Sequence, residues 1–290
     1  MAKKSDVSID FLRQLDRFRL ILKKNVSSKY QGARDTSFAG SGLTFKDYKD
    51  YVPGDDFRNI DWRVYARTDK FYVRRYEEER NVTVHIILDA SGSMEFGTPR
   101  KFDYAALLGI GFAYLALKNN EKFEFSTFAE EFRPVRARKG SKHLMSLLDY
   151  LSNVKVAGKS EFTGSLESAK SLITSKSVVI LLSDFLYSTD EIRQTLRRFK
   201  RSEVLCIQVL DPVEKAFAIE GDVILKDSEE DTELRTYITR RVQNNYRQLL
   251  EQHNAEVKEV SEQLRHHFVS VTTDMDVFDA FHEAYVELGR

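Results

Sequence analysis

Short apolar runs alternate with helix-spaced apolar residues from about residue 82 to the end of the chain. Four runs rich in Val, Ile and Leu predict buried strands, over residues 82–88, 178–184, 204–210 and 268–272. Between and after them, periodic apolar positions predict helices over residues 102–118, 140–151, 164–174, 189–200 and 275–288. Strands that alternate with helices favour right-handed crossovers. The pattern therefore predicts an α/β fold, with a doubly wound, mostly parallel sheet flanked by helices.

Segments outside this alternation are less regular. Their patterns predict a helix over 9–24, a loop over 32–42, a strand over 71–79, a strand over 122–128 with an edge strand over 132–136, a hairpin or loop over 217–227, and one or two helices over 231–267. We expect two parts. Residues 1–80 form an N-terminal extension, a helix and an aromatic, charged, β-containing block packed against the sheet. Residues 81–290 form the α/β domain.

Composition limits the possible functions. The chain has 290 residues with 45 acidic and 45 basic side chains, and this zero formal charge argues against nucleic-acid binding through a general positive field. One cysteine, Cys206, lies in an apolar run, so no internal disulfide is possible. No stretch approaches about 18 consecutive apolar residues, and the start lacks the apolar core of a secretory signal. We expect a cytoplasmic protein without an integral membrane segment.

Candidate chemistry lies just after the run over 82–88. Asp89, Ser91 and Ser93 fall where this strand gives way to its loop. In open α/β sheets, ligands bind beyond the carboxyl ends of the strands. One carboxylate and two hydroxyls are hard oxygen donors, which suit Mg²⁺ or Mn²⁺ better than Zn²⁺. The loop is therefore a candidate metal site.

The string DASGSM resembles the D-x-S-x-S signature of the metal ion-dependent adhesion site in von Willebrand factor A domains. A threonine on a second loop and an aspartate after a later strand complete that family's site. The resemblance assigns these roles to Thr163, before a helical pattern, and to Asp184, at the end of VVILLSD. It implies a von Willebrand factor A-like, Rossmann-like fold that holds Mg²⁺ or Mn²⁺. One coordination position would stay open for an acidic side chain of a client protein.

A second resemblance lies upstream. The segment GD-x-x-R-x-IDW-x-x-x-AR is similar to the bacterial family named domain of unknown function 58, and it falls on Gly54, Asp55, Arg58, Ile60, Asp61, Trp62, Ala66 and Arg67. This resemblance implies partnership with a MoxR-type AAA+ ATPase. It also implies an adaptor role in the chaperone-like assembly or activation of client proteins.

Two interpretations of this aromatic, charged block remain open. In the structural one, Trp62 covers an end of the sheet while three arginines pair with three aspartates, namely Arg58, Arg63 and Arg67 with Asp55, Asp56 and Asp61. In the functional one, the block is a partner-recognition surface that includes Arg58, Asp61, Trp62 and Arg63.

Two further functions compete with the adaptor. Asp89 could be the nucleophile of a metal-dependent phosphohydrolase, although Ser91 stands where such enzymes carry a second acid. Residues 157–160, AGKS, are similar to the end of a phosphate-binding loop, but Asn153 replaces its first glycine. A metal-independent structural scaffold is the other alternative. We expect a non-catalytic, metal-dependent protein-binding adaptor, with no catalytic residue.

Overall fold

The structure is a computed structural model that describes Arg13, Asp16 and residues 43–78, 83–119, 121–135, 141–173, 177–228 and 232–289. Arg13 and Asp16 are helical. The rest of the helix predicted over 9–24, and the loop predicted over 32–42, lie outside the described residues. None of the described helices is both long and apolar enough to cross a membrane.

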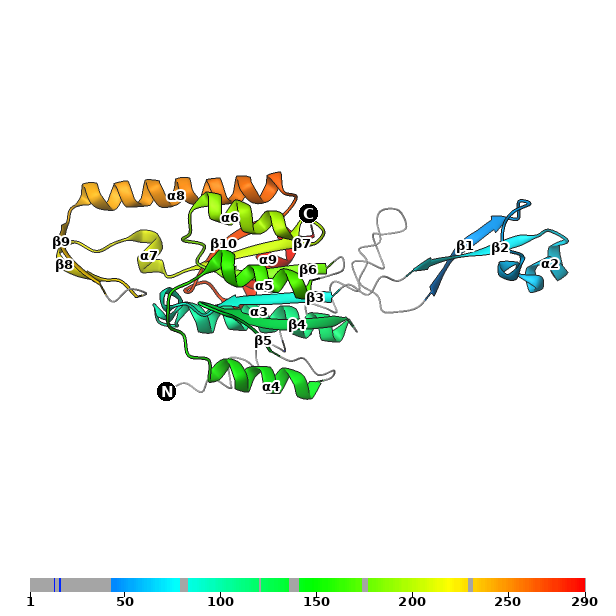
Figure 1. The fold of residues 1–290 in the computed structure, drawn as a ribbon, viewed down its shortest axis with the longest axis horizontal. Helices are drawn as coiled ribbons and strands as arrows, with labels where there is room; N and C mark the ends of the chain where they lie inside the picture. The colour runs from blue at the N-terminus through cyan, green and yellow to red at the C-terminus, as the bar shows by residue number, and fades with distance from the viewer. Residues whose placement is uncertain are drawn as a thin grey trace.

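A six-stranded sheet lies between the helices of the larger part of the molecule (Figure 1). Its strands are β3 (Thr83–Asp89), β4 (Lys122–Phe128), β5 (Phe132–Val135), β6 (Ser177–Ser183), β7 (Glu203–Leu210) and β10 (His267–Thr272). Their order is β10-β7-β6-β3-β4-β5, and every pair is parallel except β4 with β5. This doubly wound, mostly parallel sheet confirms the predicted fold class.

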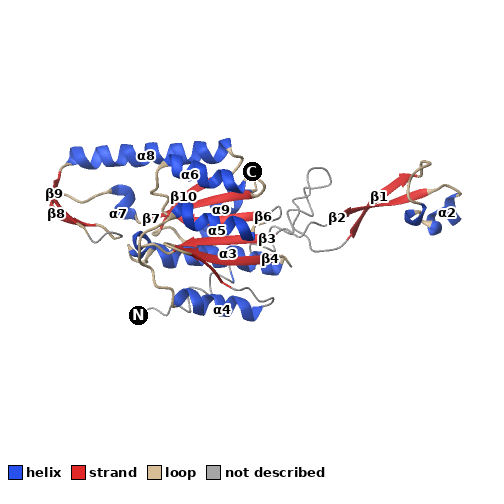
Figure 2. Ribbon diagram, viewed as in Figure 1, coloured by secondary structure: helices blue, strands red, loops and turns tan. Residues whose placement is uncertain are grey.

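Helices cover both faces of the sheet (Figures 1 and 2). One layer contains α3 (Lys101–Lys118), α4 (Ser141–Ser152) and α9 (Val277–Leu288), and the other contains α5 (Phe162–Leu172), α6 (Thr189–Leu196) with the 3-10 turn η3 (Arg197–Phe199), and α8 (Arg240–Gln263). Strand side chains alternate between the layers, so Ile86 and Leu88 pack into the first while Ile87 packs into the second. Burial on both faces explains why these strands are continuous apolar runs.

An insertion separates β7 from α8. It contains the short helix α7 (Pro212–Ala216) and the antiparallel hairpin of β8 (Gly221–Lys226) and β9 (Glu233–Ile238). The helical prediction over residues 231–267 was therefore wrong for β9 and right for α8, which begins after the cap Thr239. β9 forms by pairing with β8, the element before it, and the local pattern of ELRTYI alone does not reveal this pairing.

The aromatic, charged block folds as a small unit of its own. Strands β1 (Leu43–Asp50) and β2 (Tyr72–Glu78) pair antiparallel and enclose the 3-10 turn η1 (Phe57–Asn59) and the helix α2 (Trp62–Thr68). Figures 1 and 2 show this unit apart from the six-stranded sheet. Our expectation that the block packs against the sheet is therefore not met by the described residues.

Glu121, between α3 and β4, gives the fold a pH-dependent weakness. Both of its carboxylate oxygens are buried without a hydrogen-bond partner, and burial raises its pKa to about 8. Because the pKa of Glu121 is higher in the folded state than in the unfolded state, its carboxyl group contributes most to stability below about pH 4.5. This contribution is lost as the pH rises through about 8. We expect Glu121→Gln to raise the free energy of unfolding more at about pH 9 than at about pH 5.

Urea unfolding at the two pH values measures this difference. The exposed Glu131, which pairs with Arg133, provides the control Glu131→Gln. An equal effect of Glu121→Gln at both pH values would mean that the buried carboxyl does not titrate as described.

Candidate functional site

The carboxyl ends of β3 and β6 lie side by side, because the two strands are neighbours in the sheet. The chain continues from β3 to β4 on one side and from β6 to β7 on the other, so the strand order reverses between β3 and β6. Such a reversal leaves a crevice beyond the strand ends where ligands bind. Asp89 ends β3, Ser183 ends β6 and Asp184 follows. Two predicted site carboxylates thus lie at this edge.

Asp89 is the most enclosed group of the site. It is fully buried, and its Oδ1 accepts a hydrogen bond from the Ser91 backbone N–H at 2.9 Å. Its Oδ2 accepts from the Ser183 and Tyr187 hydroxyls, each at 2.7 Å. Burial first, and then the charge of Asp184, raise the pKa of Asp89 to about 6, although the three donors act in the opposite direction. The fold thus fixes this carboxylate in one orientation. Its three hydrogen-bond donors, one backbone N–H and two hydroxyls, carry no charge.

Two hydroxyls of the loop after β3 have the spacing of neighbouring metal ligands. Ser91 Oγ and Ser93 Oγ lie 3.2 Å apart. Adjacent ligands of an octahedral Mg²⁺, each at about 2.1 Å, are about 3 Å apart. Among the described residues, no three His, Cys, Asp or Glu side chains form a metal-binding group. An ion here would therefore depend on hydroxyl and water oxygens beside the carboxylates, a donor set that fits Mg²⁺ or Mn²⁺.

Thr163 does not join this site, contrary to our sequence prediction. It lies inside α5, and its hydroxyl contacts Thr195 Oγ1 at 3.1 Å and Glu191 Oε1 at 3.3 Å, both on α6. Because α5 begins at Phe162, the loop hydroxyl before the helix belongs to Ser160. Ser160 Oγ lies 2.5 Å from the Tyr187 hydroxyl, which in turn contacts Asp89. Ser160, three residues before Thr163 in the loop that precedes α5, thus reaches the site in its place.

Asp184 is held by a buried lysine that sequence reasoning did not identify. Lys101, in the first turn of α3, has no exposed surface, and its Nζ donates to Asp184 Oδ2 at 3.0 Å and to Glu214 Oε1 at 2.7 Å. Burial opposes the charged form of Lys101, but the two carboxylates outweigh it and raise its pKa above the ordinary value. The ammonium group fixes Asp184 and joins the site to α7.

Gly92 allows other segments to approach the loop closely. Its backbone N–H donates to Gly158 O at 2.9 Å, and the carbonyl oxygen of Ser228, after β8, lies where a Cβ of residue 92 would stand. Any side chain at this position would displace backbone atoms of Ser228. The β8–β9 hairpin therefore contacts the candidate metal loop directly.

The four residues predicted to recognise a partner differ in their exposure and contacts. Asp61 is buried and caps α2, accepting hydrogen bonds from the backbone N–H groups of Arg63 and Val64 and from the Tyr48 hydroxyl at 2.8 Å. Trp62 is 58% exposed. The predicted ion pairs with Arg58, Arg63 and Arg67 were wrong for two of the aspartates. Asp55 binds Lys49 instead, and Asp61 accepts from the backbone N–H of Arg63. Only Arg58 and Asp56 approach each other, at 3.6 Å and in an exposed position.

The Trp62 indole is held in place by aromatic neighbours. Its ring lies edge-on to the rings of Tyr65 and Phe71, at centroid distances of 6.1 and 6.4 Å, and those two rings stack on each other at 4.4 Å. Edge-to-face and stacked rings favour a defined geometry. Trp62 is thus an ordered but exposed side chain, which does not cover the end of the sheet.

The fold and this site define an α/β protein with a cluster of hydroxyls and carboxylates at the switch point of its sheet. The chain belongs to the family described as protein of unknown function DUF58, whose profile matches residues 47–256. It is 26% identical over 264 residues to uncharacterized proteins of Mycobacterium bovis and Mycobacterium tuberculosis, covering 89% of this chain and 83% of each relative.

Several solved structures are similar to the chain, among them the following three. One is an aerotolerance-related membrane protein from Bacteroides fragilis, with 16% identity, a TM-score of 0.46 and coverage of 72% of this chain and 98% of that chain. Another is the VWA domain of SpRpn10, with 13% identity, a TM-score of 0.45 and the same coverage of 72% and 98%. The third is the manganese-loaded Plasmodium vivax TRAP protein, with 14% identity, a TM-score of 0.34 and coverage of 43% and 57%.

Proposed function

We propose that this protein is a non-catalytic, metal-dependent protein-binding adaptor. Ser91 and Ser93 would hold Mg²⁺ or Mn²⁺ through their hydroxyls, and Ser160 would supply the third hydroxyl. Asp89 and Asp184 would supply negative charge, directly or through water. The observation that carries the proposal is the 3.2 Å separation of the two serine hydroxyls above a buried carboxylate.

The surrounding residues prepare the site before any ligand arrives. Ser183 and Tyr187 orient Asp89 through their hydrogen bonds, and Lys101 orients Asp184. A divalent ion held by these residues would supply positive charge that attracts an acidic side chain of a client protein. Three exposed apolar side chains lie beyond the carboxyl ends of β3, β6 and β7 and would add contact area, namely Phe96 (47% exposed), Leu186 (48%) and Val213 (43%).

The β1–β2 unit would be a second docking surface in this proposal. Trp62 and two neighbouring arginines, Arg58 and Arg63, are the residue types that dominate binding energy at protein interfaces. Asp61 would act indirectly, because it is buried and fixes the start of α2. The family resemblance favours a MoxR-type AAA+ ATPase as the partner. The zero formal charge of the chain gives no support to a nucleic-acid partner.

Metal-dependent capture tests the adaptor function. Immobilised wild-type protein should capture a reproducible set of proteins from native extract in Mg²⁺. It should not retain these proteins in chelator. Asp184→Ala should lose this capture by about tenfold or more, because it removes one carboxylate beside the ion and leaves Lys101 with Glu214 alone. Thr163→Ala is the matched control, since its hydroxyl contacts α6. Undiminished capture by Asp184→Ala in chelator would refute the adaptor mechanism, and turnover of a phosphate ester would favour the phosphohydrolase.

A further inference from the structure

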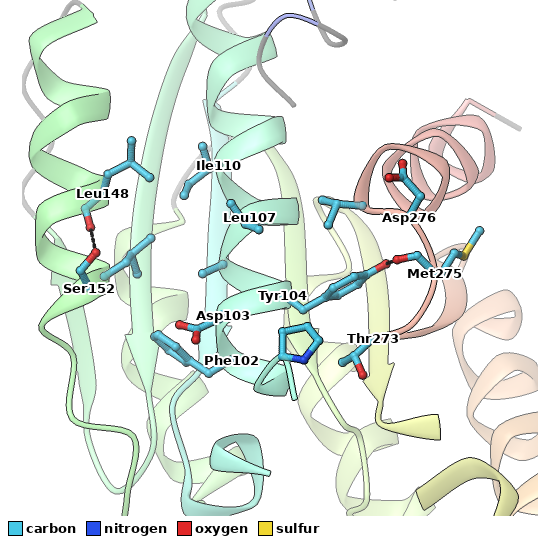
Figure 3. Close-up of a pocket in the computed structure, with 14 residues that line it drawn as sticks. Phe102, Asp103, Tyr104, Leu107, Ile110, Leu148, Ser152, Thr273, Met275 and Asp276 are labelled. Carbon is cyan, nitrogen blue, oxygen red and sulfur yellow. Dashed lines mark hydrogen bonds between the residues drawn. The ribbon is translucent and has the colours of Figure 1, made fainter. Parts of the chain in front are cut away.

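A cavity lies between α3, α4 and the segment that joins β10 to α9 (Figure 3). Its volume is about 420 Å³, within the range of about 300–1,000 Å³ typical of ligand pockets. The lining is mainly apolar and includes Phe102, Ala106, Leu107, Ile110, Leu148 and Leu151. Such a cavity can take two or three apolar side chains.

Hydrogen bonds hold the walls of this cavity in place. The Tyr104 hydroxyl on α3 donates to the carbonyl oxygen of Met275 at 2.9 Å, which fixes α3 to the β10–α9 segment (Figure 3). Thr273 donates from its backbone N–H to Leu210 O at 3.0 Å. On the opposite wall, the Ser152 hydroxyl donates to Leu148 O at 2.9 Å. Because the protein's own hydrogen bonds fix these walls, binding requires little reorganisation.

One side of the cavity is acidic, and one of its acids, Asp276, also caps α9 by accepting hydrogen bonds from the backbone N–H groups of Phe278 and Asp279. The segment before α9 and the helix itself contribute four exposed carboxylates, Asp274, Asp276, Asp279 and Glu283. Asp276 lines the cavity, and the charges of all four carboxylates, after burial, raise the pKa of Tyr104 above its ordinary value. None of the four has an ion pair within the described part of the chain. Arg100, just before α3, is bound to Asp103 and Glu95.

The acids are spread along α9. Asp276, Asp279 and Glu283 follow one another at spacings of three and four residues, which places them on one face of the helix. At about 1.5 Å per residue they extend over about 10 Å. A single small amine cannot contact all of them, whereas basic residues spaced along a polypeptide can. Charge and shape together therefore favour a peptide.

We propose that this cavity is a docking site for a polypeptide segment of a partner, with apolar side chains that enter the cavity and Lys or Arg residues that face the acids of α9. Apolar anchors in a groove flanked by complementary charge are a common mode of peptide recognition. The site is independent of the candidate metal centre.

A synthetic peptide with Leu and Lys at helical spacing, labelled with a fluorophore, tests the proposal by fluorescence anisotropy in chelator. The variant Asp276→Asn/Asp279→Asn/Glu283→Gln should weaken binding about tenfold or more. Leu107→Gln, which keeps every charge but puts an amide at the apolar wall, should also weaken it about tenfold. Glu251→Gln/Glu259→Gln/Glu262→Gln on α8 makes the same change in net charge elsewhere and should leave binding unchanged.

Thermal unfolding of each variant confirms that it is folded before its affinity is compared. Equal losses in the α9 and α8 charge variants would show general electrostatic attraction and overturn the site, as would full affinity in Leu107→Gln. Spermidine that displaces the peptide at equal concentration would overturn the assignment to a polypeptide. Chelator keeps this result separate from the adaptor proposal, which depends on metal.

Discussion

Lys101→Met should lower the free energy of unfolding by about 3–5 kcal/mol, the usual cost of removing one partner from a buried ion pair. The Lys101 ammonium group is fully buried between Asp184 and Glu214. Methionine has a similar length but no charge, so the variant leaves two enclosed carboxylates facing each other without a cation. Urea unfolding at neutral pH measures the loss.

The double variant Lys101→Met/Glu214→Gln should recover part of that stability, because one of the two unpaired charges is gone. Lys118→Met is the matched control. Lys118 is partly exposed and pairs with Asp16 at 3.4 Å, so its loss should cost at most about 1 kcal/mol. Equal effects of Lys101→Met and Lys118→Met would contradict the buried network.

Asp89→Asn should make the metal-free protein more stable at about pH 7.5, by up to about 3 kcal/mol. The folded state raises the pKa of Asp89 from 3.8 to about 6, mainly through burial and then through Asp184. Its contribution to stability is therefore fully present below about pH 4 and is lost as the pH rises through about 6. Asparagine carries no charge at any of these pH values, and its amide can still exchange hydrogen bonds with the Ser183 and Tyr187 hydroxyls.

Unfolding curves in chelator across about pH 4.5 to 7.5 test this expectation, with the wild type losing stability along the series and Asp89→Asn losing less. Added Mg²⁺ should then reverse the order at high pH, because only the wild type has the carboxylate that the ion stabilises. A wild-type protein whose metal-free stability rises over this pH range would show that Asp89 ionises without cost.

The sheet was largely predictable because its strands have strong local signals. Buried runs such as Val178–Leu182 are continuous in apolar residues, and the helices between them repeat with the period of a helix. Elements that depend on contacts outside their own segment were not predictable in this way. The β9 strand forms by pairing with β8, and the short helix α2 begins where the buried Asp61 caps it. Neither condition can be recognised from the segment alone.

The candidate site shows the same division. Asp89 and Asp184 could be located because each follows an apolar run, and Ser91 and Ser93 lie close to Asp89 in sequence. The sequence did not show which hydroxyl of the second loop belongs to the candidate metal site. Ser160 and Thr163 are three residues apart, and the choice depends on α5 beginning at Phe162. The helical pattern could not fix that boundary.

Lys101, Ser183 and Tyr187 could not be assigned in advance for a related reason. A lysine at the start of a helix, or a tyrosine after a strand, ordinarily faces solvent. Only the packing of α3 against the carboxyl ends of β3 and β6 buries Lys101 between Asp184 and Glu214.

Mn²⁺ binding, followed by electron paramagnetic resonance of the free ion, tests the central claim most directly. If three hydroxyls and two carboxylates from distant segments hold one divalent ion, the wild type and Thr163→Ala should each bind a single Mn²⁺ with the same affinity. Ser91→Ala and Ser160→Ala should bind it about tenfold or more weakly. A wild-type protein that leaves Mn²⁺ free, or a Ser91→Ala variant that binds it as tightly as the wild type, would contradict the account.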